Sequence, residues 1–539
     1  MAAFVPAHAA LRPSLSRRRS CQSLCTCSGR RVYLYAVHGR QGGHPDAEHS
    51  FRGQDAGYIV PPAEYAHMTF EQVRDARFLK KIPTLYEILG EDAVPRIPNP
   101  AARLPSFQDM DLYLAAPTDA VLKQTVVNPG KPQNFARYLR SGPREHVAFS
   151  PDEVRAAIVT CGGICPGINT VIRELTDGLA NLYGVQHIYG IRGGYRGFYD
   201  GTPFMPLNPR NVDGIHRLGG TVLGTSRGGF DLERIMHAIE EHRLNQLYLI
   251  GGDGTIKGAA AIAAECERLR RKVGVVSVPK TIDNDIPVID HSFGFMTAVE
   301  EAQRAINAAH VEVTCFPNGI GVVRLMGRNS GFIAMYATLA SRDVDCCLIP
   351  EVPFDLHGPH GLCAYIQQRL AQNGHFVLVV AEGAGQELVP EVRGADLSGN
   401  RKLADIGPFL TAQIEDYFHT IGMEVSMKYV DPTYMVRAIP PIASDQMYCA
   451  LLAHSAVHGA MAGYTSFTVG PVNGRYAMIP LSDVAGEQQR VSVRDRTWMR
   501  LLSSTGQPSA LHNGREAGSR AADGSAGAER ESAATVRPM

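Results

Sequence analysis

The chain has 539 residues, 45% of them hydrophobic, so it exceeds a typical single domain and can form a large core. Lysine plus arginine equals aspartate plus glutamate, at 53 each, so no overall field favours nucleic acid or a membrane surface as a partner. The eleven cysteines have no metal-binding spacing, which indicates a reducing compartment rather than a disulfide framework. No run of 18 apolar residues occurs, and we therefore expect a soluble protein.

The N-terminal region differs in composition from the rest of the chain. Residues 1–45 contain seven arginines, five serines and no acidic residue, a composition typical of organelle transit peptides. We expect import into the plastid (chloroplast) stroma, and a basic arm on a cytoplasmic protein is the alternative. In residues 46–150, proline and glycine break every periodic run, which predicts an N-terminal extension that wraps the core.

From residue 155 onward, short apolar runs alternate with amphipathic helical patterns. Strands are predicted at residues 156–160, 187–191, 221–225, 246–250, 273–278, 319–325, 345–349, 376–381 and near 424–430. Helices are predicted at residues 168–182, 211–218, 231–243, 256–271, 297–311, 331–341, 362–373 and 445–462, and near 406–421. This alternation predicts an α/β fold of two lobes, with mainly parallel sheets flanked by helices and a cleft between the lobes. Residues 506–539 contain almost no large apolar side chains and are predicted to be disordered.

Two polar loops each follow an apolar run that is typical of a buried parallel strand. The first loop, 251–255, offers glycines that let backbone N–H groups approach a phosphate, and a carboxylate that can hold Mg²⁺. The second, 279–285, contains the acids Asp283 and Asp285. Because parallel strands place ligands at their carboxyl ends, the loops together predict a phosphoryl-transfer centre with a general base. The alternative, a purely structural turn at 251–255, does not account for two acids in the second loop.

A third glycine-rich loop, at residues 161–167, opens an amphipathic helix and therefore offers free N–H groups to an anion. By itself this is a weak signal. Its two cysteines, Cys161 and Cys165, suggest a redox-sensitive pair, since a helix N-terminus can stabilise a thiolate. Two small buried thiols are the alternative.

Six segments in order resemble the phosphofructokinase family, in particular its plant-type ATP-dependent branch, from about residue 112 to about residue 508. These segments are residues 160–169, 224–228, 251–255, 279–285, 326–331 and 428–437. The resemblance implies two similar α/β lobes, a nucleotide-binding lobe at 151–298 and a sugar-phosphate-binding lobe at 299–505, whose C-terminal helices return to the core. It also implies transfer of a phosphoryl group from MgATP to fructose 6-phosphate in glycolysis, by an allosteric homo-oligomer, either a dimer or a tetramer.

The resemblance implies roles for individual residues. Asp283 matches the base that takes the proton of the sugar 1-hydroxyl, Thr281 a phosphoryl contact and Asp253 the carboxylate that holds Mg²⁺. Arg328 matches a group that stabilises charge in the transfer. The matched nucleotide contacts are Gly162, Arg227, Gly228, Gly252, Asp253, Gly254 and Thr255. The matched substrate contacts are Thr281, Ile282, Asp283, Met326, Gly327, Arg328, Glu382, Lys428, Tyr434, Met435, Val436 and Arg437.

Two positions bear on the phosphoryl donor. Pyrophosphate-dependent members of the family carry lysine where Lys280 stands, but they typically carry aspartate at the position of Gly254. The combination found here is the plant-type ATP pattern, so we expect ATP as donor, with pyrophosphate as the alternative. A non-catalytic regulatory subunit is a further alternative, disfavoured because Asp253, Asp283 and Arg328 are all present.

One oligomer-related position departs from the bacterial pattern. Some bacterial relatives complete the sugar-phosphate pocket with an arginine from a neighbouring subunit. Counting back from Met326, that position falls on Gly319, and only Arg324 is nearby. Sharing of the pocket between subunits therefore stays open.

Overall fold

The structure, a computed structural model, describes residues 79–105, 114–126, 136–392, 394 and 402–513. The chain divides into two units, Met1–Ala66 and His67–Met539, and every described residue belongs to the second. The predicted transit peptide at residues 1–45 lies outside the described residues.

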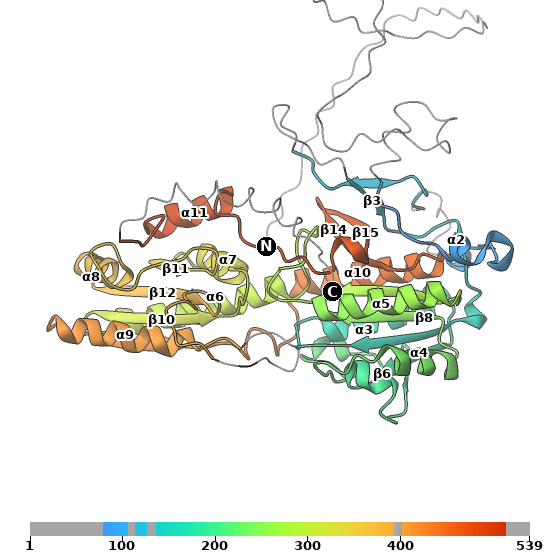
Figure 1. The fold of residues 1–539 in the computed structure, drawn as a ribbon, viewed down its shortest axis with the longest axis horizontal. Coiled ribbons are helices and arrows are strands. Elements are labelled where there is room, and N and C mark those ends of the chain that lie inside the picture. The colour runs from blue at the N-terminus through green and yellow to red at the C-terminus, as the bar shows by residue number, and fades with distance from the viewer. Residues whose placement is uncertain (1–78, 106–113, 127–135, 393, 395–401, 514–539) are drawn as a thin grey trace, which may run out of the picture. The chain divides into compact units, whose positions relative to one another are not determined.

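The first sheet has nine strands, and its centre is parallel (Figure 1). In spatial order they are β2 (Ala120–Leu122), β3 (Arg137–Arg140), β15 (Arg475–Pro480), β14 (Phe467–Val472), β9 (Gly274–Pro279), β8 (Gln246–Gly251), β5 (Arg155–Thr160), β6 (His187–Ile191) and β7 (Met205–Pro206). The five strands from β14 to β6 run parallel, whereas those outside them pair antiparallel. The loops after β5, β8 and β9 therefore leave the sheet at the same edge.

Helices cover both faces of this sheet. On one face, α3 (Ile168–Asp177) and α10 (Ala443–Met461) pack against side chains of β5, β8 and β9 in one hydrophobic core. On the other face, α4 (Leu232–Glu241) and α5 (Asp253–Arg268) pack against the alternate side chains of the same strands. Every residue of β8 and β9 is buried, as expected for parallel strands covered on both sides.

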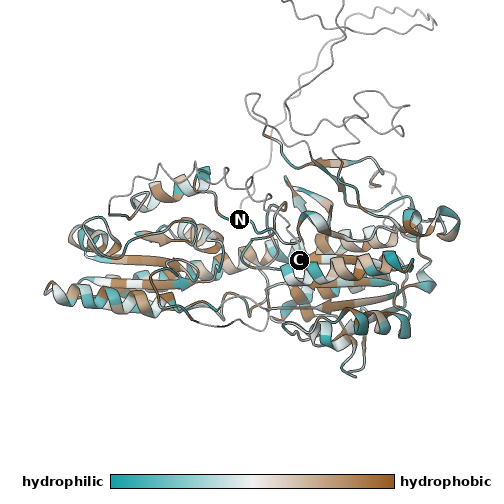
Figure 2. Ribbon diagram, in the orientation of Figure 1, coloured by the Kyte–Doolittle hydropathy of each residue, from teal (hydrophilic) through white to brown (hydrophobic). Residues whose placement is uncertain are grey.

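The second sheet has four parallel strands: β11 (Cys346–Leu348), β12 (His375–Ala381), β10 (Gly319–Leu325) and β13 (Ser426–Val430). Helices α6 (Phe295–Thr314) and α7 (Phe332–Ser341) cover one face, and α8 (Leu362–Asn373) and α9 (Ile406–Thr420) cover the other. The core under α6 and α7 is continuous with the core under α3 and α10. The predicted α/β fold with mainly parallel sheets flanked by helices is confirmed, and Figure 2 shows the expected apolar strands.

The segment 211–225 differs from the prediction of a helix followed by a strand. It contains only a 3₁₀ turn, Ile215–Arg217, preceded by Gly214 at a φ of 77°, which interrupts a helix. Instead of a strand ladder, the N–H of Val222 donates to the Asn169 side chain (2.8 Å). Because a side chain from α3 satisfies the backbone here, apolar residues alone do not form a strand.

Several elements were not anticipated from the sequence. The strands β14 and β15 extend the first sheet, and β2 and β3 from the N-terminal extension continue it. The remaining strands and α-helices are the edge strand β7, α2 (Leu85–Leu89), the β1 (Ile97–Pro98) and β4 (His146–Val147) pair, and α11 (Arg496–Thr505). Short strands such as these are ordered by pairing with the sheet, a long-range effect that local patterns do not carry.

Residues 506–513, predicted to be disordered, are packed instead. The Gln507 side chain accepts from the N–H of Cys347 (2.7 Å) and donates to the carbonyl of the same residue (3.2 Å). Leu511 is buried in the core beside α8 and α9. The side-chain amide of Gln507 thus continues the edge of the second sheet, a partnership that composition does not reveal.

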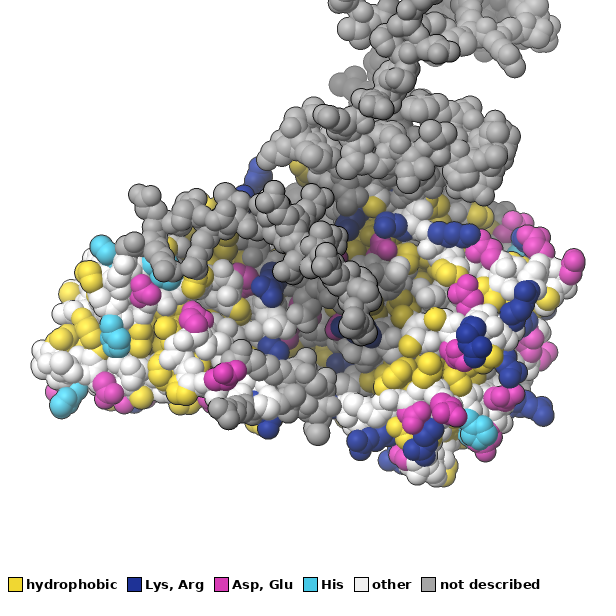
Figure 3. Space-filling view, in the orientation of Figure 1, with side chains coloured by type: hydrophobic (Ala, Val, Ile, Leu, Met, Phe, Trp, Pro, Cys, Tyr) yellow, Lys and Arg dark blue, Asp and Glu magenta, His cyan; other side chains and the backbone are white. Residues whose placement is uncertain are grey.

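The described surface agrees with the balanced composition. Acidic and basic side chains are interspersed over the described part of the face shown in Figure 3. Within the described ranges, no helix is long and apolar enough to cross a membrane. A large field of one sign is therefore not evident on this face.

His458 on α10 is a buried titratable group within the core. Its Nδ1 lies 2.7 Å from the hydroxyl of Tyr183, and burial, with the nearby His454 and Arg144, lowers the pKa of His458 to about 3. In the unfolded chain the imidazole of His458 becomes protonated below about pH 6.5, whereas in the folded chain it becomes protonated only near pH 3. Folding stability from this group is therefore present above pH 6.5 and is lost as the pH falls.

We predict that His458→Gln, which keeps a partner for Tyr183 but cannot be protonated, weakens the acid sensitivity of the fold. Between pH 7 and pH 5 the wild type should lose about 2 kcal/mol more unfolding free energy than the variant, by proton linkage. Urea unfolding at both pH values measures this. Substitution of the exposed His187 by Gln is the control, and an identical pH dependence in wild type and His458→Gln would contradict the prediction.

Candidate functional site

The loop after β5 and the loop at 224–228 are joined by hydrogen bonds. The N–H of Gly162 donates to the carbonyl of Ser226 (3.0 Å), and the hydroxyl of Thr225 donates to the carbonyl of Gly162 (2.7 Å). Arg227 and Gly228 follow directly and are exposed. The structure thus brings together three of the predicted nucleotide contacts.

The loop after β8 leads directly into α5, which begins at Asp253, three residues earlier than predicted. A side chain at Gly251 would lie 2.1 Å from the Thr255 hydroxyl, so only glycine fits there. Gly254 is the opposite case, because a Cβ there would meet nothing within 4 Å. The first turn of α5 therefore presents free N–H groups beside an open space at Gly254.

Lys280 lies beneath the glycine-rich loop that follows β5, residues 161–167. Its ammonium donates to the carbonyl of Gly163 (2.7 Å) and lies 3.6 Å from where a Cβ of Gly162 would stand. The side chain is buried, and burial lowers the pKa of Lys280. In this arrangement, Lys280 supports the loop that follows β5.

Asp283 is the most perturbed carboxyl group of the site. Its N–H donates to the Thr281 hydroxyl (3.1 Å), and its Oδ1 is buried without a hydrogen-bond partner among the described residues. Burial raises the pKa of Asp283 to about 8, with further upward contributions from the charges of Asp285 and Glu382. Arg328 and Lys280 oppose this increase. Such a carboxylate is poised to accept a proton near neutral pH.

Asp253 and Asp285 form a pair of carboxylates beside this base. Asp253 accepts from the ammonium of Lys257 (2.7 Å) and from the N–H of Gly486 (3.1 Å). Burial raises the pKa of Asp285, and the charge of Asp253 raises it further. No separate role was expected for Asp285, although the sequence shows it as the second acid of its loop.

These two carboxylates fit a magnesium ion. Mg²⁺ prefers oxygen ligands and is usually held by one or two carboxylates together with phosphates and water. Within the described ranges, no group of three or more His, Cys, Asp or Glu side chains is arranged to hold a metal. The two carboxylates of Asp253 and Asp285 therefore suit a metal ion whose remaining ligands are phosphate oxygens and water.

The second sheet contributes the loop after β10. Ser330 donates from its hydroxyl to the carbonyl of Asp283 (3.2 Å), so this loop contacts the loop that carries the base. The N–H of Glu382 donates to the carbonyl of Leu325 (2.9 Å), and the N–H of Gly383 donates to that of Gly327 (3.1 Å). The charges of Arg328 and Glu382 both act on Asp283. Predicted residues from the two sheets thus meet at one place.

The turn at 431–438 carries further predicted substrate contacts. Val436 is buried, whereas Tyr434 and Met435 are 75% and 60% exposed and so are open to a ligand. The Arg437 guanidinium lies 5.3 Å from the centroid of the Tyr434 ring. A side chain at Gly219 would lie 2.1 Å from the carbonyl of Ala438, which shows how closely the turn approaches the first sheet's loops.

Lys428 is not brought to this cluster. Its ammonium pairs with Glu312 (3.3 Å) and lies 4.4 Å from the centroid of the Phe316 ring. Glu312 belongs to the last turn of α6, and Lys428 pairs in the sheet with Gly321, well before β10 ends at Leu325. The phosphate-binding role expected for Lys428 stays a prediction.

A C-terminal segment missed by the sequence analysis crosses the site. Besides the Gly486 contact with Asp253, the N–H of Gln489 donates to the carbonyl of Asp285 (2.7 Å). The N–H of Val491 then donates to Glu351 (2.7 Å), which also accepts from the N–H of Gly331 (3.1 Å). The segment therefore links the acidic loops of the first sheet to the start of α7.

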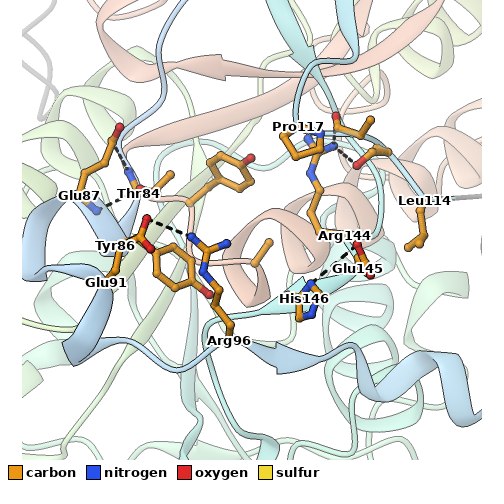
Figure 4. Close-up of a pocket in the computed structure, with 14 residues that line it drawn as sticks. Thr84, Tyr86, Glu87, Glu91, Arg96, Leu114, Pro117, Arg144, Glu145 and His146 are labelled. Atoms are coloured by element: carbon orange, nitrogen blue, oxygen red, sulfur yellow. Dashed lines mark hydrogen bonds and ion pairs between the residues drawn. The ribbon is translucent and has the colours of Figure 1, made fainter. Parts of the chain in front are cut away.

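A pocket of about 750 Å³ lies apart from these motifs (Figure 4). Its walls come from 84–96, 114–117, 144–146 and 462–464. The charged groups in it already have partners; for example, Arg96 pairs with Glu91 (3.1 Å). None of the predicted site residues lines this pocket, so it is not the predicted phosphoryl-transfer centre.

Comparison with known proteins identifies relatives of the chain. The sequence profile of the family described as "Phosphofructokinase" matches residues 155–460. "ATP-dependent 6-phosphofructokinase 7" of Arabidopsis thaliana is 55% identical over 436 residues, covering 80% of this chain and 89% of the relative. "ATP-dependent 6-phosphofructokinase 4, chloroplastic" of the same plant is 55% identical over 442 residues, covering 81% of this chain and 83% of the relative.

A solved structure agrees with the fold. The pyrophosphate-dependent phosphofructokinase of Marinobacter aquaeolei matches with a TM-score of 0.55 and 19% identity, covering 65% of this chain and 91% of that one. At such low identity the match supports the α/β architecture alone.

The two cysteines of the loop after β5 are buried. Burial raises the pKa of Cys161 to about 12 and raises the pKa of Cys165 as well. The thiol of Cys165 donates to the carbonyl of Phe293 (3.2 Å). Burial outweighs the effect of the helix N-terminus, so the alternative of two buried thiols is favoured over a reactive pair.

We predict that neither Cys161 nor Cys165 reacts with iodoacetamide in the native protein at pH 7.5, whereas the exposed Cys315 does. Peptide mapping by mass spectrometry measures the modification at each site. Labelling in urea, which should reach all three residues, is the control. Native labelling of Cys161 or Cys165 at the rate of Cys315 would revive the redox hypothesis.

Proposed function

Since this chain belongs to the phosphofructokinase family, it transfers the γ-phosphoryl group of ATP to fructose 6-phosphate, and we propose that Asp283 is the base. The observation that carries the proposal is the buried Oδ1 of Asp283, which has no hydrogen-bond partner among the described residues. An acceptor held in this state has its lone pairs free for a substrate hydroxyl.

The transfer then follows from the groups around Asp283. Asp283 accepts the proton of the 1-hydroxyl while that oxygen forms a bond to the γ-phosphorus, and the bond from the phosphorus to the β-phosphate oxygen breaks. Thr281 lies beside the reacting groups, and Arg328 supplies positive charge that stabilises the transferring group. The products are fructose 1,6-bisphosphate and ADP, formed directly without a phosphoenzyme.

The nucleotide is held, in this proposal, by the loops of the first sheet. The contacts are Gly162, Arg227, Gly228, Gly252, Gly254 and Thr255. Asp253, assisted by Asp285, would hold Mg²⁺, which when bound neutralises phosphate charge. The ammonium of Lys257 donates to one oxygen of Asp253 (2.7 Å), so the metal would share this carboxylate with it. Lys280 supports the glycine loop from beneath, which is compatible with ATP as donor.

The sugar phosphate is held mainly by the second sheet's loops. Glu382 would accept hydrogen bonds from sugar hydroxyls, and Tyr434 and Arg437 would bind the 6-phosphate, for which a guanidinium is well suited. Thr281, Ile282, Met326, Gly327, Met435 and Val436 would complete the contacts. Lys428, whose ammonium pairs with the half-exposed Glu312, would bind phosphate only after exchanging this partner.

The organisation of the chain remains part of the proposal. We assign nucleotide binding to residues 151–298 and sugar-phosphate binding to residues 299–505, with 46–150 as an extension. Homo-oligomerisation is expected from the family. The basic composition of residues 1–45, together with a relative named chloroplastic, supports import into plastids.

We predict that Asp283→Asn lowers kcat by about 10²–10⁴, the usual contribution of a general base, while fructose 6-phosphate still binds. Coupled assays of ADP formation and calorimetric titration of the sugar measure the two effects. For the wild type, kcat/KM should rise with pH through about 8, because the base must be deprotonated. Asp290→Asn is the control, because this exposed carboxylate accepts from the N–H groups of Asn473 (2.9 Å) and Gly474 (2.7 Å), so the substitution should affect stability rather than turnover. Turnover that survives Asp283→Asn would remove the assignment.

We predict that the wild type uses MgATP but not magnesium pyrophosphate, and that Gly254→Asp raises the KM for ATP at least about tenfold. The new side chain meets open space, so the variant should fold, but its charge opposes the nucleotide phosphates. Gly254→Asn separates the effect of charge from that of size. Wild-type activity with pyrophosphate would show instead that Lys280 decides the donor.

A further inference from the structure

The guanidinium of Arg324 on β10 lies among carboxylates from three other segments of the chain. Its Nη2 donates to Oε2 of Glu382 (3.1 Å) and its Nη1 to Oδ2 of Asp431 (3.0 Å). Its Nε lies 3.3 Å from Oδ1 of Asp405, and Nη1 also donates to the Thr433 hydroxyl (2.9 Å). The side chain is only 15% exposed, so these contacts are largely shielded from water.

The partners of Arg324 are the starting points of the substrate-binding segments. Glu382 directly follows β12, and Asp431 opens the turn that leads to Arg437. Asp431 also accepts from the N–H of Thr433 (3.0 Å), and the N–H of Val436 then donates to the carbonyl of Pro432 (3.0 Å). The orientation of this turn therefore depends on where Asp431 is held.

We propose that Arg324 is a positioning residue for the sugar phosphate: it fixes the Glu382 carboxylate and the turn 431–437 relative to the loop 326–328. This inference rests on the proposed function of Glu382 and of that turn. Arg324 itself lies two residues before Met326 at the end of β10 and acts through its partners.

Electrostatics explains why arginine is required at this position. Without its positive charge, three carboxylates would face one another in a partly buried site and would repel. Their separation would move Glu382 away from the sugar hydroxyls and loosen the turn that carries Arg437. Lysine would restore the charge but, as a compact ammonium, could not bind several partners in fixed directions as the planar fork does.

The test uses the full chain with Arg324→Met and Arg324→Lys. We expect Arg324→Met to raise the KM for fructose 6-phosphate at least about tenfold while the KM for ATP changes less than about twofold, because only sugar contacts are displaced. Arg324→Lys should recover part of the loss. Calorimetric titration with fructose 6-phosphate alone should show the same order of affinities.

A matched control separates this role from general stability. Arg369 on α8 forms a comparable pair with Asp345 (2.6 Å), which directly precedes β11 of the second sheet, but contacts none of the proposed substrate residues. Arg369→Met should lower the melting temperature and leave the KM for fructose 6-phosphate unchanged. The proposal is overturned if Arg324→Met lowers stability alone, or if both variants change sugar affinity equally.

Two further results would also decide the role of Arg324. If Arg324→Met does not fold, Asp431→Asn, which removes one partner, should still weaken sugar affinity, and unchanged affinity overturns the proposal. If the wild type binds fructose 6-phosphate but forms no ADP, the proposed reaction fails, whereas the titrations still decide the role of Arg324.

Discussion

The site depends on the burial of one carboxylate, that of Asp283, where loops of the two sheets meet. Withdrawing an ionised carboxylate from water is unfavourable unless opposite charges or hydrogen bonds compensate. Here the compensation is partial: Arg328 and Lys280 favour the charged form, whereas Asp285 and Glu382 oppose it. Burial is the largest cause of the raised pKa of Asp283, and charged residues from the loops of both sheets adjust it further.

The parallel sheets explain how such a point can be built. Strands β5, β8 and β9 end at one edge of the first sheet, so three loops distant in sequence are adjacent there. The second sheet adds the loop after β10, which reaches Asp283 through Ser330. Glycines keep the donor side open, as at Gly254, while buried Lys280 supports the neighbouring loop. The open space at Gly254 suits an anion because the N-terminus of α5 borders it.

Much of the fold was predictable because buried parallel strands leave a strong local signal. Strand β6 was predicted at its observed bounds, 187–191, and most other strands of the two sheets within two residues. The prediction was wrong at 211–225, where Asn169 from α3 satisfies the backbone. It also omitted β14 and β15, whose order comes from pairing with β9 and with each other.

The sequence by itself determined the chemistry of the loops: which glycines can approach a phosphate, which carboxylates can act, and which family they resemble. Only the tertiary structure decided which of these groups meet. It paired Lys428 with Glu312, buried Cys161 and Cys165, and surrounded Arg324 with three carboxylates: Glu382 directly after β12, Asp405 directly before α9 and Asp431 directly after β13. The physical reason is that burial and electrostatic partnership depend on distances across the sheets, whereas motifs record only neighbours along the chain.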